Sequence, residues 1–146
     1  MKKIILAILF GATSLAAQAQ SNQVTDTHLL KHYYELRDAL INSDGVTASY
    51  RVTDVINAGG TRITDATVKQ LASAGKDLQK QRDAFAKLSL EVAVLAKKEK
   101  LTQDLIYQVY CPMKKTYWLS SEPIVKNPYY GKAMLTCGNI TETIKP

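Results

Sequence analysis

The chain has 146 residues, of which 46% are hydrophobic, and a formal net charge of +6 at pH 7. This length fits one domain with a core that needs no disulfide, and no apolar run reaches the roughly 20 residues of a membrane-spanning helix. A basic protein can bind nucleic acid or an anionic membrane. The N-terminal residues predict export, which argues against nucleic acid as a partner.

These N-terminal residues have the three parts of a secretory signal peptide. Lys2-Lys3 is a positively charged start, residues 4–10 are a short apolar stretch, and residues 17–19 read Ala-Gln-Ala, a small-x-small cleavage pattern. We therefore predict a signal peptide over residues 1–19 and a single mature domain over residues 20–146. No cysteine directly follows the apolar stretch, so we expect no lipid anchor. No later apolar run reaches membrane length, so we expect no membrane insertion, and the signal peptide predicts a periplasmic or secreted protein.

Four stretches have the hydrophobic periodicity of α-helices. Apolar residues three and four positions apart predict a first helix over residues 26–42 and a second over residues 46–58. A third helix follows a possible cap at Thr64-Asp65 and ends near Gly75. The fourth and clearest begins near Leu78 and ends in the basic cluster of residues 97–100, where cations complement the helix dipole.

The helical stripes also predict the core. We expect six apolar side chains to be buried: Leu36, Leu40, Phe85, Leu88, Val92 and Leu95. Arg82 lies on or beside the stripe of the fourth helix. We interpret it as a tie between helices, with its stem packed on the apolar face and its guanidinium on a carboxylate or a carbonyl.

The composition changes from residue 105 onward. Residues 105–110 are aromatic and β-branched, which indicates a short strand or extended segment. Three prolines and two glycines then interrupt residues 111–138. The predicted fold is therefore mainly α, an antiparallel bundle of about four helices, with an irregular C-terminal lobe anchored by Trp118, Tyr129 and Tyr130.

This C-terminal region holds every soft donor of the mature chain. Cys111 and Cys137 are the only cysteines, and Met113 and Met134 are the only methionines besides the initiator. Thiolate and thioether sulfurs select Cu(I) and related soft ions such as Ag(I). The alternative is a Cys111–Cys137 disulfide, which fits an oxidising compartment and is worth about 3 kcal/mol, with the methionines filling the core. The residues alone favour the disulfide.

Six short motifs in fixed order make the chain resemble the domain of unknown function 3347 family. Two lie in predicted helices, at residues 33–44 (Tyr-Tyr-Glu-Leu-Arg-Asp-Ala-Leu-Ile-Asn-Ser-Asp) and 81–89 (Gln-Arg-Asp-Ala-Phe-Ala-Lys-Leu-Ser). The other four are Tyr-Cys-Pro-Met at residues 110–113, Trp-Leu-Ser at 118–120, Asn-Pro-Tyr-Tyr-Gly at 127–131 and Met-Leu-Thr-Cys-Gly at 134–138. The chain departs from the family in the short connection of residues 114–117, where relatives often have a longer, glycine-containing stretch.

Members of that family occur alone in exported proteins and as an extra domain on periplasmic adaptor subunits of heavy-metal efflux pumps. The resemblance implies a helical domain associated with copper or silver handling, with heavy-metal efflux components of the cell envelope as possible partners, and it implies no established enzyme activity. With the resemblance added, a metal site formed by Cys111, Met113, Met134 and Cys137 is preferred to the disulfide. The alternative remains a disulfide-locked interaction domain that docks on an envelope partner.

The remaining motifs carry little chemistry. His28 and His32 are four residues apart and share a helix face, a spacing that can bind a metal ion. No carboxylate is evident as a third ligand, so a surface pair is the favoured interpretation. The chain has no Cys-x-x-Cys, no phosphate-binding glycine loop and no nucleophile elbow, and we predict that it is not an enzyme.

Overall fold

The computed structural model describes residues 15–146, with side chains from Thr27 onward. Over these residues the helices come first: α1 (Leu15–Ile41), α2 (Gly45–Gly59), α3 (Asp65–Ser73) and α4 (Leu78–Lys98), with a 3-10 turn η1 (Gly60–Arg62) after α2. The strands β1 (Ile106–Cys111), β2 (Thr116–Ser120) and β3 (Asn139–Ile144) follow, with a second 3-10 turn η2 (Gly131–Met134) before β3. The predicted mainly α class with four helices is confirmed.

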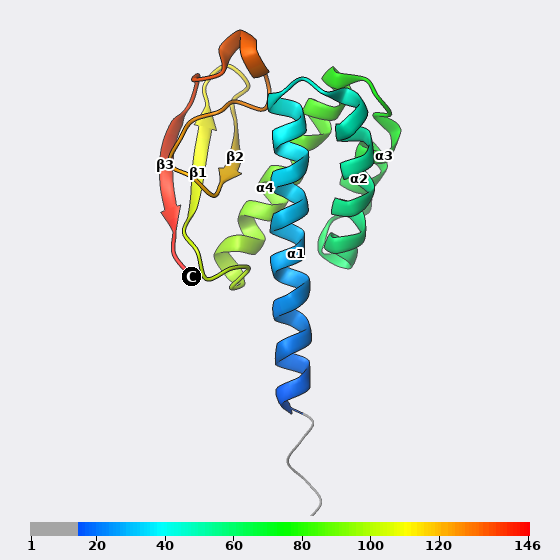
Figure 1. The fold of residues 1–146 in the computed structure, drawn as a ribbon, viewed down its shortest axis with the longest axis vertical. Helices are drawn as coiled ribbons and strands as arrows, with labels where there is room; N and C mark the ends of the chain where they lie inside the picture. Colours follow the sequence, from blue (N-terminus) through cyan, green and yellow to red (C-terminus); the bar gives the residue numbers. More distant parts are fainter. Residues whose placement is uncertain (1–14) are drawn as a thin grey trace, which may run out of the picture.

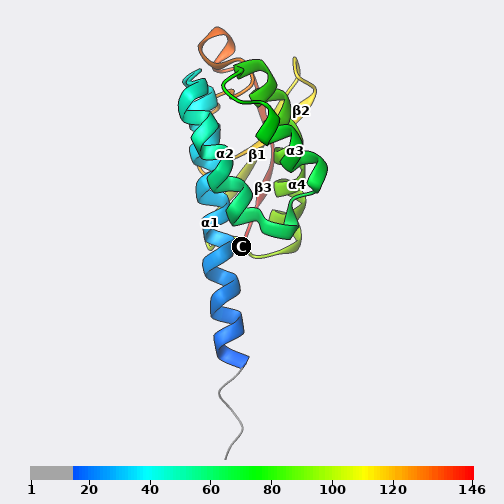
Figure 2. The same cartoon turned by 90° about the vertical axis from the view of Figure 1, so that its right-hand side faces the viewer.

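The helices and the sheet form two parts that share one core. Helix α1 lies between the sheet and α2, and its first turns project beyond the other elements (Figure 1). From the side, α1 and α2 lie along one face of the molecule, whereas α3 and α4 lie along the other (Figure 2). Helix α4 packs against both α3 and β2, so it joins the helices to the sheet.

The predicted irregular C-terminal lobe is wrong, because the lobe is a three-stranded antiparallel sheet of order β2-β1-β3. Its register pairs Val109 with Trp118 on one side and with Ile140 on the other. The prolines that suggested irregular structure lie in the connections. Pro112 is in the β1–β2 turn, and Pro123 and Pro128 are in the loop from β2 to η2. Strands of five or six residues fit between these interruptions.

Local capping explains the helix boundaries that the sequence predicted well. The carboxylate of Asp44 accepts a hydrogen bond from Thr47 N at the start of α2, the Thr64 side chain caps α3, and Asp77 caps α4. Helix α1 starts well before the predicted residue 26, because the Ala and Gln residues there are good helix formers.

The predicted signal peptide over residues 1–19 lies mostly outside the described residues. No helix in residues 15–146 is long and apolar enough to cross a membrane.

Five of the six predicted core side chains are buried, and Leu95 is half-buried near the end of α4. The centre of the core is a row of aromatic rings. Tyr33 stacks on Phe85 with ring centroids 5.0 Å apart, and Tyr129 contacts both Phe85 and Trp118 at 6.0 Å. This row runs from α1 through α4 to the sheet. The aromatic residues expected to anchor the lobe therefore also hold it on the helices.

Arg82 ties three segments together, as predicted. Its Nε donates to the carbonyl of Pro128 at 3.0 Å, and its Nη2 donates to the Leu40 carbonyl and to Ser43 Oγ, each at 3.1 Å. The guanidinium thus joins α4 to the end of α1 and to the loop before η2. All of its partners are uncharged oxygens.

Gly131, at the end of the Asn-Pro-Tyr-Tyr-Gly motif, has a left-handed backbone with φ of +54°. A Cβ atom there would lie 2.7 Å from Ser43 Oγ and 2.9 Å from both Arg82 Nη2 and the Ile41 carbonyl oxygen. We expect Gly131→Ala to lower the free energy of unfolding by at least about 2 kcal/mol, from backbone strain and from this contact. Urea unfolding measures the loss. Gly75→Ala is the matched control, because Gly75 has φ of +53° and open space around it. Equal losses in the two variants would contradict the close approach.

Candidate metal centre

The first hairpin of the sheet places Cys111 and Met113. Cys111 is the last residue of β1, pairs with Thr116 of β2, and has a fully buried side chain. Met113 lies in the turn between these strands and is 58% exposed. Lys115 closes the turn with φ of +56°. The Cys-Pro-Met motif therefore places one sulfur in the core and the other at the surface.

The second motif lies on the segment that leads into β3. Met134 is the last residue of η2, and Cys137 follows in the connection to β3; both are half-buried. The backbone N–H of Cys137 donates to the carbonyl of Met134 at 3.0 Å, which closes this short turn. Both cysteines are free thiols.

Asn127 joins the two cysteine segments. Its buried Nδ2 lies 3.2 Å from Cys111 Sγ and donates to the Cys137 carbonyl at 2.7 Å. Its Oδ1 accepts from Tyr129 N at 2.8 Å, and its backbone N donates to the Leu135 carbonyl at 2.7 Å. One side chain thus spans the end of β1 and the segment before β3. The sequence motifs far apart in the chain meet at this amide.

The Cys111 sulfur also receives a second donor. The backbone N–H of Lys114 points at Cys111 Sγ with a separation of 3.4 Å. Two N–H groups on one sulfur complement negative charge there, as the outer partners of a metal-bound ligand do. The structure therefore brings Cys111, Cys137 and Met134 into one hydrogen-bonded region, whereas Met113 is at the exposed hairpin turn.

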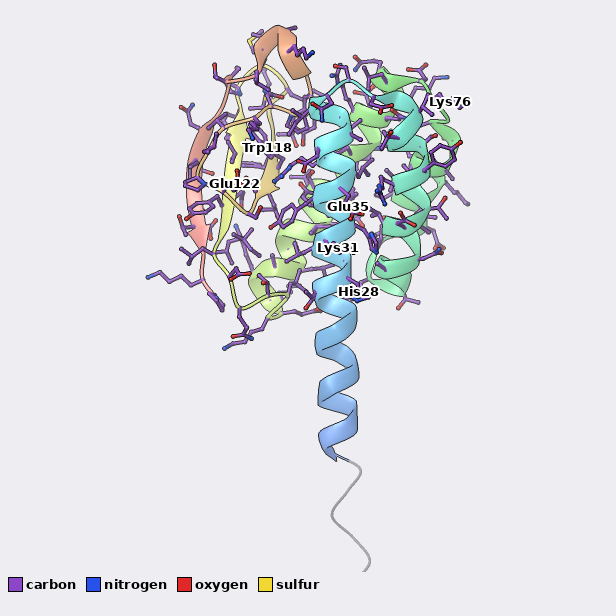
Figure 3. The ribbon with its side chains drawn as sticks, in the orientation of Figure 1. His28, Lys31, Glu35, Lys76, Trp118 and Glu122 are labelled. Atoms are coloured by element: carbon purple, nitrogen blue, oxygen red, sulfur yellow. The ribbon has the colours of Figure 1, made fainter. Side chains whose placement is uncertain are left out.

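Aromatic side chains cover the buried side of this region. Trp118 lies on β2 (Figure 3), and a Cβ atom at Gly138 would come within 2.5 Å of its ring. The Tyr129 hydroxyl donates to the carbonyl of Tyr117, and burial raises the pKa of Tyr129 well above its ordinary value, so the side chain stays neutral. Glycine at position 138 lets the indole ring approach the backbone next to Cys137.

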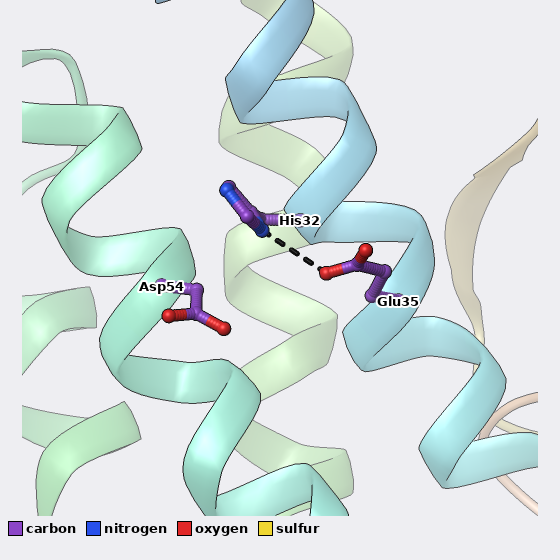
Figure 4. Close-up of side chains that lie close together, drawn as sticks. All are labelled: His32, Glu35 and Asp54. Carbon is purple, nitrogen blue, oxygen red and sulfur yellow. Dashed lines mark hydrogen bonds and ion pairs between the residues drawn. The ribbon is translucent and has the colours of Figure 1, made fainter.

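Sequence reasoning missed a second group of possible ligands, between α1 and α2. Among the described residues, one group of three possible metal-ligating side chains lies together: His32, Glu35 and Asp54. Their ligand atoms all lie within 4.8 Å of one another (Figure 4). The carboxylate ligand that was not evident from the sequence is therefore present beside His32. The His-x-x-Glu spacing of His32 and Glu35 was a local signal, since residues three apart share a helix face. Asp54 comes from α2, and only the fold places it there.

No protein-family model matches the chain, and no curated protein or solved structure is significantly similar to it. The family resemblance stated from the motifs therefore remains a prediction.

Proposed function

We propose that this protein is a soft-metal module that binds Cu(I) or Ag(I) through Cys111 and Cys137, with Met134 and Met113 as thioether donors. The observation that carries the proposal is the shared amide of Asn127, which contacts the sulfur of one cysteine and the carbonyl of the other. Thiolates together with thioethers are the donor set that soft monovalent ions prefer. Such a set fits copper or silver better than magnesium or calcium.

The burial of the two cysteines suggests how an ion would be held and released. Cys111 is enclosed and accepts two N–H groups, so it would hold the ion within the fold. Cys137 and Met134 are half-buried, and Met113 is exposed at the hairpin turn. A partner's sulfur ligand could therefore replace the outer donors while Cys111 still holds the ion. This graded exposure supports a carrier or accessory that passes metal on, with the ion as cargo.

The envelope setting of the proposal comes from the sequence. The predicted signal peptide supports a periplasmic or secreted location, and the family resemblance supports heavy-metal efflux components as partners. Nucleic acid is not a partner in this proposal, and neither is the interior of a membrane.

A disulfide-locked interaction domain is the second candidate, because Asn127 brings the end of β1, which carries Cys111, next to the segment that carries Cys137. Ligand linkage separates the two functions. A metal module gains thermal stability when Cu(I) or Ag(I) is added under reducing conditions, since the ion binds the folded state. A purely structural bridge instead loses stability when it is reduced, and added metal does not restore it.

A competition titration with a Cu(I) chelator, under reductant and without oxygen, tests the proposal. We expect Cys137→Ser or Cys111→Ser to weaken Cu(I) binding by roughly 100-fold or more, because each removes an anionic sulfur ligand. Met134→Leu and Met113→Leu should have smaller effects, because leucine keeps the volume and removes only a neutral donor.

His28→Ala is the control, and it should leave Cu(I) affinity unchanged. Thermal unfolding of each variant reports whether it is folded, which matters most for the buried Cys111. The half-buried Cys137 is the safer position to test. The proposal fails if the reduced wild type binds Cu(I) no better than the double variant Cys111→Ser, Cys137→Ser.

A further inference from the structure

The second ligand group lies on the side of α1 that faces α2, away from the sheet (Figures 1 and 4). His32 and Glu35 project from α1, and Asp54 projects from α2. His32 Nδ1 lies 3.0 Å from Glu35 Oε2. The side chains are 21%, 30% and 40% exposed for His32, Glu35 and Asp54, so a solvated ion can reach all three.

We propose that His32, Glu35 and Asp54 form a site for a divalent ion of the zinc type. One imidazole and two carboxylates are ligands that Zn(II) accepts, and they contain none of the sulfur that Cu(I) prefers. Zinc–ligand bonds of roughly 2.0–2.2 Å place ligand atoms about 3.3–3.6 Å apart around a tetrahedral ion. The donor atoms already lie within 4.8 Å of one another, so small side-chain rotations are enough to close the site.

The fourth position has a candidate on the same helix. The rings of His28 and His32 meet edge to face with centroids 6.2 Å apart. His28 is exposed, one turn before His32 (Figure 3). Either this second imidazole or a water molecule completes four-fold coordination.

Arg51 now holds the position that a cation would take. Its Nη1 lies 3.2 Å from Glu35 Oε2 and 3.2 Å from Asp54 Oδ2, and the side chain is 40% exposed. The guanidinium neutralises the two carboxylates in the absence of metal. A long, partly exposed arginine can turn outward into solvent, so an incoming ion displaces it from the carboxylates. In this proposal Arg51 competes with the metal for the two carboxylates, whereas in a permanent ion-pair network its removal would not strengthen metal binding.

This site is independent of the sulfur site and of the proposed Cu(I) function. It draws on other residues, on the helical part of the fold, and on harder donors. The protein would then offer two sites of different chemical preference, one for soft monovalent ions and one for zinc-like divalent ions.

Titration of the full-length protein with Zn(II), and with Co(II) as a spectroscopic substitute, tests the proposal. We expect His32→Ala to weaken binding at this site at least tenfold, and Arg51→Gln to strengthen it several-fold. Co(II) bound here should give the visible absorption bands of nitrogen and oxygen ligands. Sulfur-to-cobalt charge-transfer absorption should be absent, because it would indicate binding at the cysteines. Asp38→Asn is the matched control, because Asp38 is a carboxylate of α1 that pairs with Arg37.

The gain expected for Arg51→Gln is the sharpest outcome, since a variant that merely loses its fold cannot bind metal more tightly. Loss of the sulfur-free Co(II) bands in His32→Ala, with the Asp38→Asn control unchanged, supports the site. If wild type and His32→Ala bind Zn(II) and Co(II) equally, or if Arg51→Gln gives no gain, the cluster is an ion-pair network and the proposal is overturned.

Discussion

Replacing Phe85 by alanine should lower the free energy of unfolding by about 3–5 kcal/mol, the usual cost of removing a fully buried aromatic ring. Phe85 has no exposed surface and sits between Tyr33 of α1 and Tyr129 of the loop before η2. The substitution therefore opens a cavity where the helices meet the sheet. Because three elements line this cavity, local collapse can fill little of it.

Urea or guanidinium unfolding measures this loss, and Leu90→Ala is the matched control. Leu90 lies on the same helix but is 47% exposed, so its truncation should cost less than about 1 kcal/mol. A loss below about 1 kcal/mol for Phe85→Ala as well would show that the packed face of α4 is assigned incorrectly.

Changing Asn127 to aspartate should also cost about 3–5 kcal/mol at neutral pH, although the two side chains have the same shape. The substitution replaces the donating Nδ2 by an oxygen that faces Cys111 Sγ and the Cys137 carbonyl. The new carboxylate is fully buried without a cation, which is among the most costly changes in a core. It also removes the link between β1 and the segment before β3.

The pH dependence of this variant provides a second measurement. Burial should raise the pKa of the introduced carboxyl above its value in the unfolded chain. The loss of stability should then be smaller near pH 4, where the protonated carboxyl can donate one hydrogen bond, and larger as pH rises. Asn139→Asp is the control, because Asn139 is exposed on β3. If both variants are equally stable at pH 8, Asn127 does not have the joining role described above.

The helices could be predicted from the sequence because the signals that define them are local. A cap such as Asp44, Thr64 or Asp77 lies within three residues of the groups it satisfies, and the apolar stripe of α4 repeats along one segment. Burial of Phe85 and Leu88 follows from that stripe. The burial of Leu95 was overestimated, because periodicity identifies the buried face of a helix but not where the elements that cover this face end.

The strand expected at residues 105–110 is confirmed as β1, but the sheet that it forms could not be predicted, because the other strands are short and the pairing with β3 joins segments distant in sequence. β3 exposes every residue except Ile144, so it lacks the alternation of a half-buried strand. The candidate sites divide in the same way. The two cysteines could be identified as candidate ligands from their rarity alone. The role of Asn127 between their segments could not, because an Asn-Pro step in a sequence indicates only a turn. The helical spacing of His32 and Glu35 is a signal in the sequence that was overlooked, whereas the position of Asp54 depends on the packing of α2 on α1.

Strand β3 also bears on how separate copies of the protein would meet. It lies at the edge of the sheet, where unpaired backbone groups can accept a strand from another molecule. Its exposed residues are polar apart from Ile140, the ladder with β1 is irregular at Gln108 and Val109, and Glu142 forms an ion pair with Lys97 of α4 at 2.6 Å. A second chain adding here would have to bury this charged pair and follow a distorted ladder. The edge thus resists strand-to-strand aggregation without a covering helix.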